Sequence, residues 1–249
     1  MKVLGIIPAR YQSTRFPGKP LAMIEGKSMI MHVYEQAKKC EGLDEVVVAT
    51  DNKAIFSHVK SMGAKALMTS EHHKSGTERC AEALEKTEGG FEVLINIQGD
   101  EPFINPKQIQ KVIDLFSNKS VKIGTLIKRI TEIPQLKSPN IVKAVIGSSG
   151  EALYFSRSVI PFPRDLDEKE WLNSIRFYKH IGLYGYRSQT LTELVKLNEG
   201  MLEQAESLEQ LRWLENGYKI QTSETQEDTS GIDTYEDLLE VVKKLKNSN

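Results

Sequence analysis

The chain has 249 residues, of which 39% are hydrophobic and 27% are charged, and its formal net charge is −1. This composition fits a soluble globular protein with a sizeable core, built as one large α/β domain or two small ones. The balanced charge excludes a general attraction to nucleic acid or to membrane surfaces, so any anion binding must come from local clusters of cations.

The first predicted strand, residues 3–7, leads into a polar loop that carries Arg10, Arg15 and Lys19. An apolar run bounded by loop signals is typical of a buried parallel strand, and ligands bind beyond the carboxyl ends of such strands. Three cations on one short loop indicate a polyanion, most simply a nucleoside triphosphate, because an Arg fork can hold two phosphate oxygens. The loop is not a Walker P-loop, since Pro20 follows the Gly-Lys pair. A solvated basic loop is the alternative interpretation.

Strands and helices alternate over the next hundred residues. Apolar periodicity predicts strands at 45–50, 64–68 and 91–98, a helix capped by Ser28 and a helix that begins at Pro106. Between these strands lie two more predicted helices, one that contains Ile55, Val59 and Met62 and ends at Gly63, and one that the polar segment 69–79 opens and that runs to about Glu88. This alternation predicts βαβ crossovers and a mostly parallel sheet with helices on both faces.

The pattern changes after residue 120. Strands are predicted at 121–130, 142–146, 152–155, 178–186 and 218–222, with a proline-marked extended segment at 156–163 and helices at 188–197, 203–216 and 234–245. We therefore expect one domain with an inserted, more antiparallel subregion.

The remaining global signals are negative. No apolar stretch is long enough to cross a bilayer, and no signal peptide precedes the first strand. Cys40 and Cys80 lack metal-ligand spacing and are expected to be free buried thiols, compatible with a reducing cytosol. The sequence contains no Ser-His-Asp arrangement and no zinc pattern, and the adjacent His72 and His73 are poorly placed to chelate one metal.

Two carboxylates are candidates for metal binding. Asp100 follows the strand 91–98, where a carboxylate could hold Mg²⁺ beside substrate phosphates, and the alternating side chains of extended backbone point Glu101 away. A turn in which Asp100 bonds its own backbone is the alternative. Asp233 precedes the last helix, where position alone favours a helix cap over a metal ligand.

Three further groups combine polar residues with a predicted element. Ser75 and Arg79 lie at a helix start that could attract an anion or a base carbonyl, although plain capping is the favoured interpretation from sequence. His180 and Tyr184 share one face of a strand, and with Arg157 they could hold a hydroxylated acidic ligand. Structural roles are the usual alternative for such residues. The last group lies near a helix start, where a solvated helical face is the alternative: Glu206, Glu209, Gln210 and Arg212.

Seven segments together resemble the 3-deoxy-manno-octulosonate (Kdo) cytidylyltransferases, also called CMP-Kdo synthetases. They are PARYQSTRFPGKPL at 8–21, SGTER at 75–79, NIQGDEP at 96–102, SRSVIPF at 156–162, HIGLYGYR at 180–187, LEQLR at 208–212 and GIDT at 231–234. These motifs span nearly the whole chain in family order. Two departures are Glu78, where Asp is expected, and Tyr235, where Pro often begins the last helix.

The resemblance implies a nucleotide-diphospho-sugar transferase fold, which is Rossmann-like, in a single domain over residues 1–249. The nucleotide-binding part would cover about 1–120, and a sugar-binding and dimerisation subregion about 121–225. It implies transfer of CMP from CTP to the anomeric hydroxyl of Kdo, with release of pyrophosphate, for lipopolysaccharide biosynthesis. Mg²⁺ dependence, a homodimer and a Gram-negative bacterial cytoplasm are implied as well. The alternatives are a cytidylyltransferase for another acidic sugar, such as an 8-amino Kdo analogue or a sialic acid, and a non-catalytic nucleotide-binding regulator.

The resemblance also assigns roles by position. Arg10, Arg15 and Lys19 would face the triphosphate, and Lys19, Arg10, Asp100 and Asp233 would be the catalytic set. The nucleotide-binding set would be completed by Ala9, Ser75, Arg79 and Gln98. Asp100 and Asp233 would hold magnesium, which reverses the capping interpretation of Asp233. The residues that would surround the sugar acid are Arg157, His180, Tyr184, Glu209 and Gln210.

Overall fold

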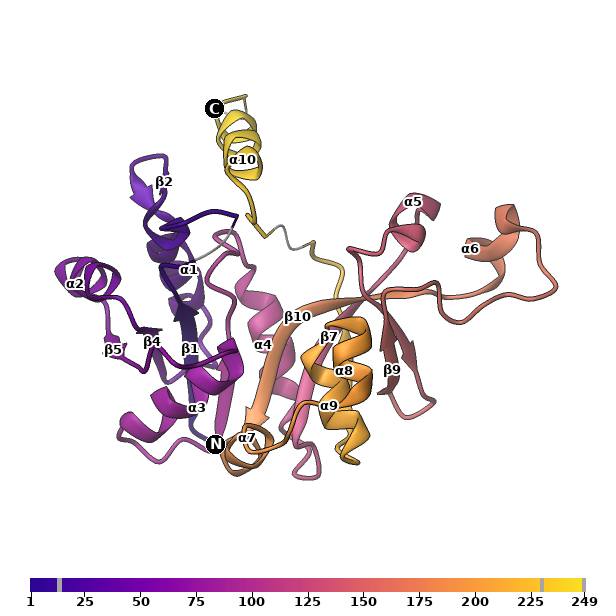
Figure 1. Cartoon of the computed structure of the whole chain (residues 1–249), viewed down its shortest axis with the longest axis horizontal. Coiled ribbons are helices and arrows are strands. Elements are labelled where there is room, and N and C mark those ends of the chain that lie inside the picture. The colour runs from indigo at the N-terminus through magenta and orange to yellow at the C-terminus, as the bar shows by residue number, and fades with distance from the viewer. Residues whose placement is uncertain (13–14, 229–230, 248–249) are drawn as a thin grey trace. The chain divides into compact units, whose positions relative to one another are not determined.

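The structure, a computed structural model, describes residues 1–12, 15–228 and 231–247. Ser13, Thr14 and Ser230, which the sequence motifs include or adjoin, lie outside the described residues. The chain divides into two compact units, with unit 1 formed by Met1–Gln110 and Thr229–Asn249 and unit 2 by Lys111–Asp228. The elements of each unit are labelled in Figure 1.

Unit 1 contains a parallel sheet in the order β5-β4-β1-β6. Its strands are β1 (Val3–Ala9), β4 (Glu45–Thr50), β5 (Ala66–Met68) and β6 (Val93–Asn96). The helices are α1 (Met29–Lys38), α2 (Lys53–Ser61) and α3 (Gly76–Lys86), and α4 (Pro106–Leu115) begins here. Each connection returns the chain in the same direction, as βαβ units require. The predicted parallel α/β arrangement is confirmed.

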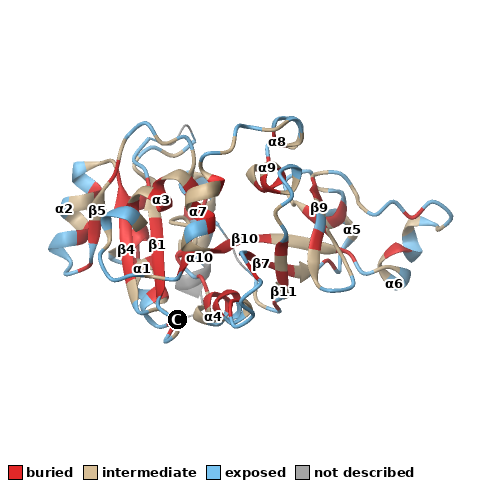
Figure 2. Cartoon of the chain, turned by 90° about the horizontal axis from the view of Figure 1, so that it is seen from below, coloured by how far each residue is buried: buried red, intermediate tan, exposed pale blue. Residues whose placement is uncertain are grey.

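The strands of unit 1 are buried because helices cover the sheet. Five of the six residues of β4 and six of the seven residues of β1 are buried, and both strands are largely red in Figure 2. Continuous apolar sequences suit such strands, since neither face meets water. Consequently the polar ends of these strands, rather than their faces, are available to a ligand.

The C-terminal helix α10 (Tyr235–Asn247) belongs to unit 1 although it is remote in sequence. It packs on the small hairpin of β2 (Met23–Ile24) and β3 (Lys27–Ser28), which follows the short 3-10 helix η1 (Lys19–Leu21). The shared core consists of Ile24, Met29, Ile232 and Leu238. This packing returns the end of the chain to the segment that follows β1.

Unit 2 contains strands in the order β10-β7-β11-β9-β8, and most of its pairings are antiparallel. The strands are β7 (Ile123–Arg129), β8 (Lys143–Ile146), β9 (Glu151–Ser156), β10 (Tyr178–Arg187) and β11 (Ile220–Glu224). The helices are α5 (Ile133–Lys137), η2 (Glu168–Glu170), α6 (Trp171–Ser174), α7 (Ser188–Leu194), α8 (Met201–Glu206) and α9 (Glu209–Glu215). The predicted antiparallel character of this region is confirmed.

Strand β10 contains an irregularity that changes its pairing with β7. His180 pairs with Ile127, whereas Tyr184 pairs with Thr125, so four steps along β10 match two steps along β7. A regular strand would separate His180 and Tyr184 by about 13 Å along its axis. The bulge shortens this spacing, and the two rings lie with centroids 5.2 Å apart.

The structure differs from the sequence prediction at several boundaries. The predicted helix at 203–216 is divided into α8 and α9 because Ser207 adopts a left-handed conformation with φ of 52°. The predicted strand at 91–98 ends at Asn96, and the β2–β3 hairpin and helices α5 and α6 were not foreseen. Within the described residues, no helix combines the length and the apolar character that a membrane span needs.

Candidate active site

A backbone hydrogen bond at Gly18 connects the end of the cationic loop to its beginning after β1. The Gly18 amide donates to the carbonyl of Tyr11 at 2.9 Å, which brackets the loop between β1 and η1. Gly18 has a φ of 72°, and a Cβ there would lie 3.3 Å from the Tyr11 ring. Glycine therefore suits both the backbone and the space at this position. Lys19, the first residue of η1, follows directly from this turn.

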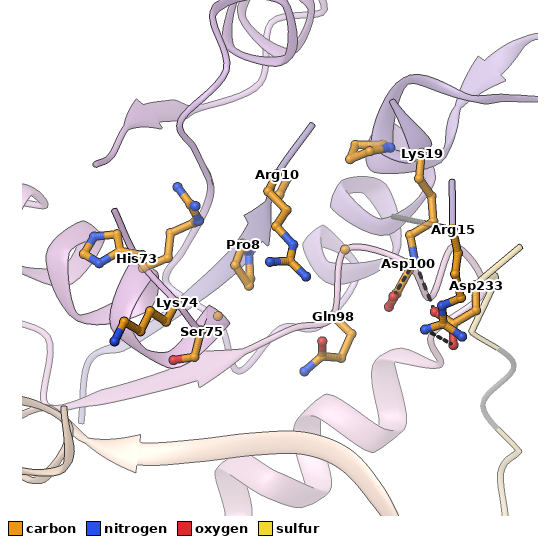
Figure 3. A pocket seen from close by; sticks show the side chains of 15 residues that line it. Pro8, Arg10, Arg15, Lys19, His73, Lys74, Ser75, Gln98, Asp100 and Asp233 are labelled. Atoms are coloured by element: carbon orange, nitrogen blue, oxygen red, sulfur yellow. Dashed lines mark hydrogen bonds and ion pairs between the residues drawn. The ribbon is translucent and has the colours of Figure 1, made fainter. Parts of the chain in front are cut away.

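Lys19 joins the two candidate metal carboxylates. Its ammonium lies 2.8 Å from Asp100 Oδ2 and 3.3 Å from Asp233 Oδ1, and Arg15 lies 3.4 Å from Asp233 Oδ2. The Lys19 side chain is only 14% exposed, so its charge is held close to both acids. Figure 3 shows Arg15, Lys19, Asp100 and Asp233 gathered at one side of the cavity. The expected convergence of Asp100 and Asp233 is therefore observed.

Core packing explains why Asp233 reaches this position. Ile232 is fully buried in the cluster that joins α10 to the hairpin, and its amide donates to the Asp100 carbonyl at 2.9 Å. Thr234 and Asp237 cap α10 reciprocally: Thr234 Oγ1 accepts from the Asp237 amide, and the Asp237 carboxylate accepts from the Thr234 amide. The Asp233 side chain is not the cap, so the capping interpretation drawn from its position is wrong.

Asp100 and Glu101 have different surroundings, as predicted, but the reason is a turn after β6, closed by the Glu101 amide donating to the Gln98 carbonyl at 3.3 Å, and not the alternation of extended backbone. Asp100 lines the cavity, whereas the Oε2 atom of Glu101 is buried and has no hydrogen-bond partner in the described part of the chain. Burial, together with the neighbouring Asp100 charge, raises the pKa of Glu101 to about 7. Gly99 permits this turn, because a Cβ there would lie 2.8 Å from the Pro8 carbonyl oxygen.

The cavity beside these residues has a volume of 410 Å³ and belongs entirely to unit 1. Ala9, Ser75 and Gln98 also contribute to its wall, so all of the predicted nucleotide-binding residues line it. Its acidic lining residues are Asp100 and Asp233, and its Arg and Lys residues are Arg10, Arg15, Lys19, Lys74 and Arg79. An excess of cations over carboxylates in one concave site favours a polyanionic ligand.

Helix α3 begins at the cavity wall. Ser75 caps the helix by accepting from the Glu78 amide at 3.2 Å, and the Glu78 carboxylate accepts from the Lys74 amide at 2.7 Å. The capping interpretation of Ser75 is confirmed, although Ser75 also lines the cavity. Glu78, where Asp was expected, completes this reciprocal cap, so the departure from the family pattern leaves the helix start intact.

Arg79 forms part of the wall, and its guanidinium is held by protein groups. It is 3% exposed, lies 2.6 Å from Asp51 Oδ2, and donates to Thr69 Oγ1 and to the Ser70 carbonyl. This arrangement fixes the first turn of α3 against the segments that follow β4 and β5. The predicted contact of Arg79 with cytosine or ribose stays a prediction.

Sequence reasoning missed His73 and Lys74 at this wall. His73 Nε2 contacts the Glu82 carboxylate, which also lies 2.6 Å from Lys86 and accepts from the Ser70 amide at 2.7 Å. The only available signal was the polar run before Ser75, because the acids that partner His73 lie five and nine residues further along the chain.

In unit 2, the bulge of β10 gathers the residues predicted to bind the sugar. His180 packs between Phe155 and Tyr184, and Tyr184 packs edge-on against Trp213. Glu209, at the start of α9, is near enough to raise the pKa of Tyr184 further after burial has raised it. Gln210 follows Glu209 and is buried. The structure therefore brings His180, Tyr184 and Glu209 together, while their contact with a sugar stays a prediction.

Arg157 has a different environment from the one expected. Its guanidinium donates to the carbonyls of Glu206 at 2.7 Å, Pro139 at 3.0 Å and Ser207 at 3.4 Å. Fully buried Lys143, which sequence reasoning missed, donates to the Ser138 and Ile141 carbonyls at 2.9 and 2.7 Å and also to that of Arg157. Burial lowers the pKa of Lys143. Through these hydrogen bonds, Lys143 and Arg157 connect the loop before β8 to the end of β9. A role for Arg157 in sugar binding stays a prediction.

Comparison with known proteins agrees with this architecture. The cytidylyltransferase family model matches residues 4–220. The 3-deoxy-manno-octulosonate cytidylyltransferases of Parabacteroides distasonis and Bacteroides thetaiotaomicron are 53% and 52% identical to the chain, each with 99% of both sequences covered. The solved structure of CMP:2-keto-3-deoxy-manno-octonic acid synthetase complexed with CTP is 41% identical and has a TM-score of 0.92, with both chains covered completely.

A more distant structure shares the fold alone. The 4-diphosphocytidyl-2C-methyl-D-erythritol synthase of Anaerococcus prevotii has a TM-score of 0.64 at 10% identity and covers 98% of each chain. The fold and the matches thus define a nucleotidyltransferase of the cytidylyltransferase class. Within that class, the chain belongs to the 3-deoxy-manno-octulosonate cytidylyltransferase family.

The Glu82 contacts predict a pH-dependent contribution to stability. Burial raises the pKa of Glu82, but Lys86, the Ser70 amide and His73 outweigh it and lower the pKa from 4.5 to about 2. Because the folded-state pKa is depressed, the ionised carboxylate stabilises the protein above about pH 4.5, and this stability is lost as the pH falls towards 2. We expect Glu82→Gln to lower the free energy of unfolding by about 1–3 kcal/mol at pH 7.

Denaturant unfolding between pH 7 and pH 2 measures this difference, and the exposed Glu85 on the same helix provides the control variant Glu85→Gln. The gap between wild type and Glu82→Gln should close below pH 4.5, while Glu85→Gln should stay within about 0.5 kcal/mol of wild type throughout. A gap that is constant with pH would contradict the ionic role of Glu82.

Proposed function

We propose that this protein transfers CMP from CTP to the anomeric hydroxyl of Kdo, giving CMP-Kdo and pyrophosphate. The observation that carries the proposal is the cavity in which Lys19 joins Asp100 to Asp233 beside further cations, in a chain related over its full length to Kdo cytidylyltransferases. Relatives named for Kdo favour this sugar over another acidic sugar. Retention of both carboxylates also favours an enzyme over a non-catalytic regulator.

The reaction needs no nucleophile from the protein. The sugar hydroxyl attacks the α-phosphorus of CTP and pyrophosphate leaves, so alignment and neutralisation of phosphate charge are sufficient for catalysis. Arg10, Arg15 and Lys19 lie on the loop that follows β1 and would pair with the phosphate oxygens. Their charges would stabilise the negative charge that develops on the departing pyrophosphate. Unit 2 would bind the sugar acid through the residues around the β10 bulge.

The carboxylates of Asp100 and Asp233 are the groups that would hold Mg²⁺. Magnesium is bound in such enzymes by one or two carboxylates, by water and by substrate phosphates, and two acids that meet at one cation fit this requirement. When bound, Mg²⁺ would lower the pKa of the attacking hydroxyl and neutralise phosphate charge. In the described residues, no cluster of three or more acidic, His or Cys side chains offers a separate metal site.

The cellular setting follows from the proposed product. CMP-Kdo is an activated sugar for lipopolysaccharide biosynthesis, and we place its synthesis in the cytoplasm, where CTP is made. We also propose that the protein acts as a homodimer. Unit 2 exposes large apolar side chains that a second copy would cover, with exposed fractions of 57% for Leu153 and 69% for Phe162.

Substitution of Asp100 tests the proposed metal site. Asp100→Asn keeps the size of the side chain but removes its charge, so we expect turnover to fall by roughly 100-fold or more with little change in melting temperature. Pyrophosphate release with CTP, Kdo and Mg²⁺ measures the effect. Asp44→Asn is the matched control, because Asp44 accepts from the Val3 amide at the opposite end of β1. Near-normal turnover by folded Asp100→Asn would remove Asp100 from the catalytic set.

Substitution of Lys19 tests the proposed phosphate contact. Loss of one charge-assisted hydrogen bond should weaken CTP binding by about 10- to 100-fold, because such bonds contribute roughly 1.5–3 kcal/mol. We expect Lys19→Ala to show this loss in calorimetric titration with CTP, with the KM for Kdo changed less than threefold. Lys65→Ala is the control, since Lys65 pairs with Glu45 and lies outside the cavity lining. Unchanged CTP affinity together with unchanged turnover would contradict the proposed role.

A further inference from the structure

We propose that the buried hydroxyl of Thr125 positions His180 by fixing its ring hydrogen on Nε2, which leaves Nδ1 as an acceptor for a hydroxyl group of the sugar. Thr125 would thus be a positioning residue that acts on the substrate through His180. The sugar part of this inference rests on the proposed function, whereas the ring tautomer depends on unit 2 alone.

The β10 bulge places Thr125 among four polar groups, one of which is the hydroxyl of Tyr184, close enough to interact with the Thr125 side chain. Its Oγ1 atom lies 3.1 Å from the Ile181 carbonyl oxygen, 2.9 Å from the Leu183 carbonyl oxygen and 3.0 Å from His180 Nε2. Thr125 lies opposite Tyr184 in the β7–β10 register and is fully buried. In the described part of the protein, the bulge therefore directs two backbone carbonyls and the His180 ring towards one hydroxyl.

Counting hydrogens determines the direction of these contacts. A threonine hydroxyl has a single hydrogen to donate, and carbonyl oxygens can only accept. When Thr125 donates to the Ile181 carbonyl, the Leu183 carbonyl or the Tyr184 oxygen, its own oxygen can only accept from the imidazole. His180 Nε2 must then be the protonated nitrogen. In the other tautomer, Nε2 would be the acceptor and Thr125 would donate its hydroxyl hydrogen to it. Neither the Ile181 nor the Leu183 carbonyl would then receive a hydrogen bond from Thr125.

The state of the His180 ring agrees with this assignment. Burial lowers its pKa to about 3, so the ring is neutral near pH 7 and has one donor and one acceptor nitrogen. The residue as a whole keeps part of its surface exposed although its ring is largely removed from water, and Nδ1 has no hydrogen-bond partner in the residues that the structure describes. A ring with its hydrogen on Nε2 therefore offers an Nδ1 lone pair to a ligand.

The chemistry of Nδ1 selects the part of the sugar acid that it contacts. A neutral acceptor attracts an O–H donor, whereas it gives no favourable contact to a carboxylate, which only accepts. His180 would consequently recognise a sugar hydroxyl, and the carboxylate of the sugar must be bound by other groups.

Nitrogen NMR of the wild-type protein tests the tautomer directly. With ¹⁵N-labelled histidine, we expect the His180 ring to show a slowly exchanging proton on Nε2 and none on Nδ1 at pH 7. The ring signals can be assigned by their absence in His180→Gln. A proton on Nδ1 would overturn the proposal. Thr125→Val should remove the protection of the Nε2 proton from exchange, and Thr125→Ser should restore it.

Kinetics test the consequence for the sugar. We expect Thr125→Val to raise the KM for Kdo by about 3- to 10-fold, the effect of one hydrogen bond, with the KM for CTP unchanged and with recovery in Thr125→Ser. The control is Thr222→Val, because Thr222 also donates to a carbonyl, that of Gly150, at 2.7 Å in unit 2. Thr222→Val should leave both KM values within twofold of wild type.

The possible results separate this inference from the proposed function. If the Nε2 signal behaves as expected but the KM for Kdo is unchanged in folded Thr125→Val, the role of Thr125 in sugar recognition is overturned. Equal rises in the KM for Kdo and for CTP, without rescue by serine, would show a general loss of structure and would also overturn it. Absence of CMP-Kdo synthesis by the wild type would refute the proposed function, while the NMR result would still decide the tautomer.

Discussion

One ammonium group between two carboxylates from distant parts of the chain organises the candidate site. Lys19 joins Asp100, in the turn after β6, to Asp233, just before the last helix. Two carboxylates brought together without a cation would repel each other, so the arrangement is stable only while a positive charge lies between them. In the proposed reaction, the metal would take over this neutralising role and Lys19 would pair with phosphate.

The rest of unit 1 keeps this interaction in place through ordinary packing. The apolar cluster of Ile24, Met29, Ile232 and Leu238 fastens the last helix, and the Ile232 amide bonds directly to the Asp100 carbonyl. Unit 2 uses a comparable device, because buried Lys143 and Thr125 each gather several backbone carbonyls around one polar atom. In both units, side chains that we do not place in contact with substrate determine where the proposed substrate-contacting residues lie.

Much of the fold was predictable because it depends on local periodicity. The strand at 45–50 was predicted with its observed bounds, and the parallel and antiparallel regions were correctly separated. All of the residues that the family resemblance assigns to nucleotide binding line the cavity. His73, Lys143 and Thr125 were missed because their importance arises from partners remote in sequence or from the β10 bulge. Local sequence was also insufficient for Asp233, because its position before the last helix suggested a helix cap. In the structure, Thr234 and Asp237 form the cap of that helix instead.

The most direct test of this account is a crystal structure grown with CTP and Mg²⁺. We expect a magnesium ion with oxygen ligands from Asp100, Asp233 and the triphosphate at about 2.0–2.1 Å. We also expect Lys19 to contact a phosphate oxygen in that complex. A metal bound to the triphosphate with both carboxylates turned away, and with Lys19 still between them, would contradict the account.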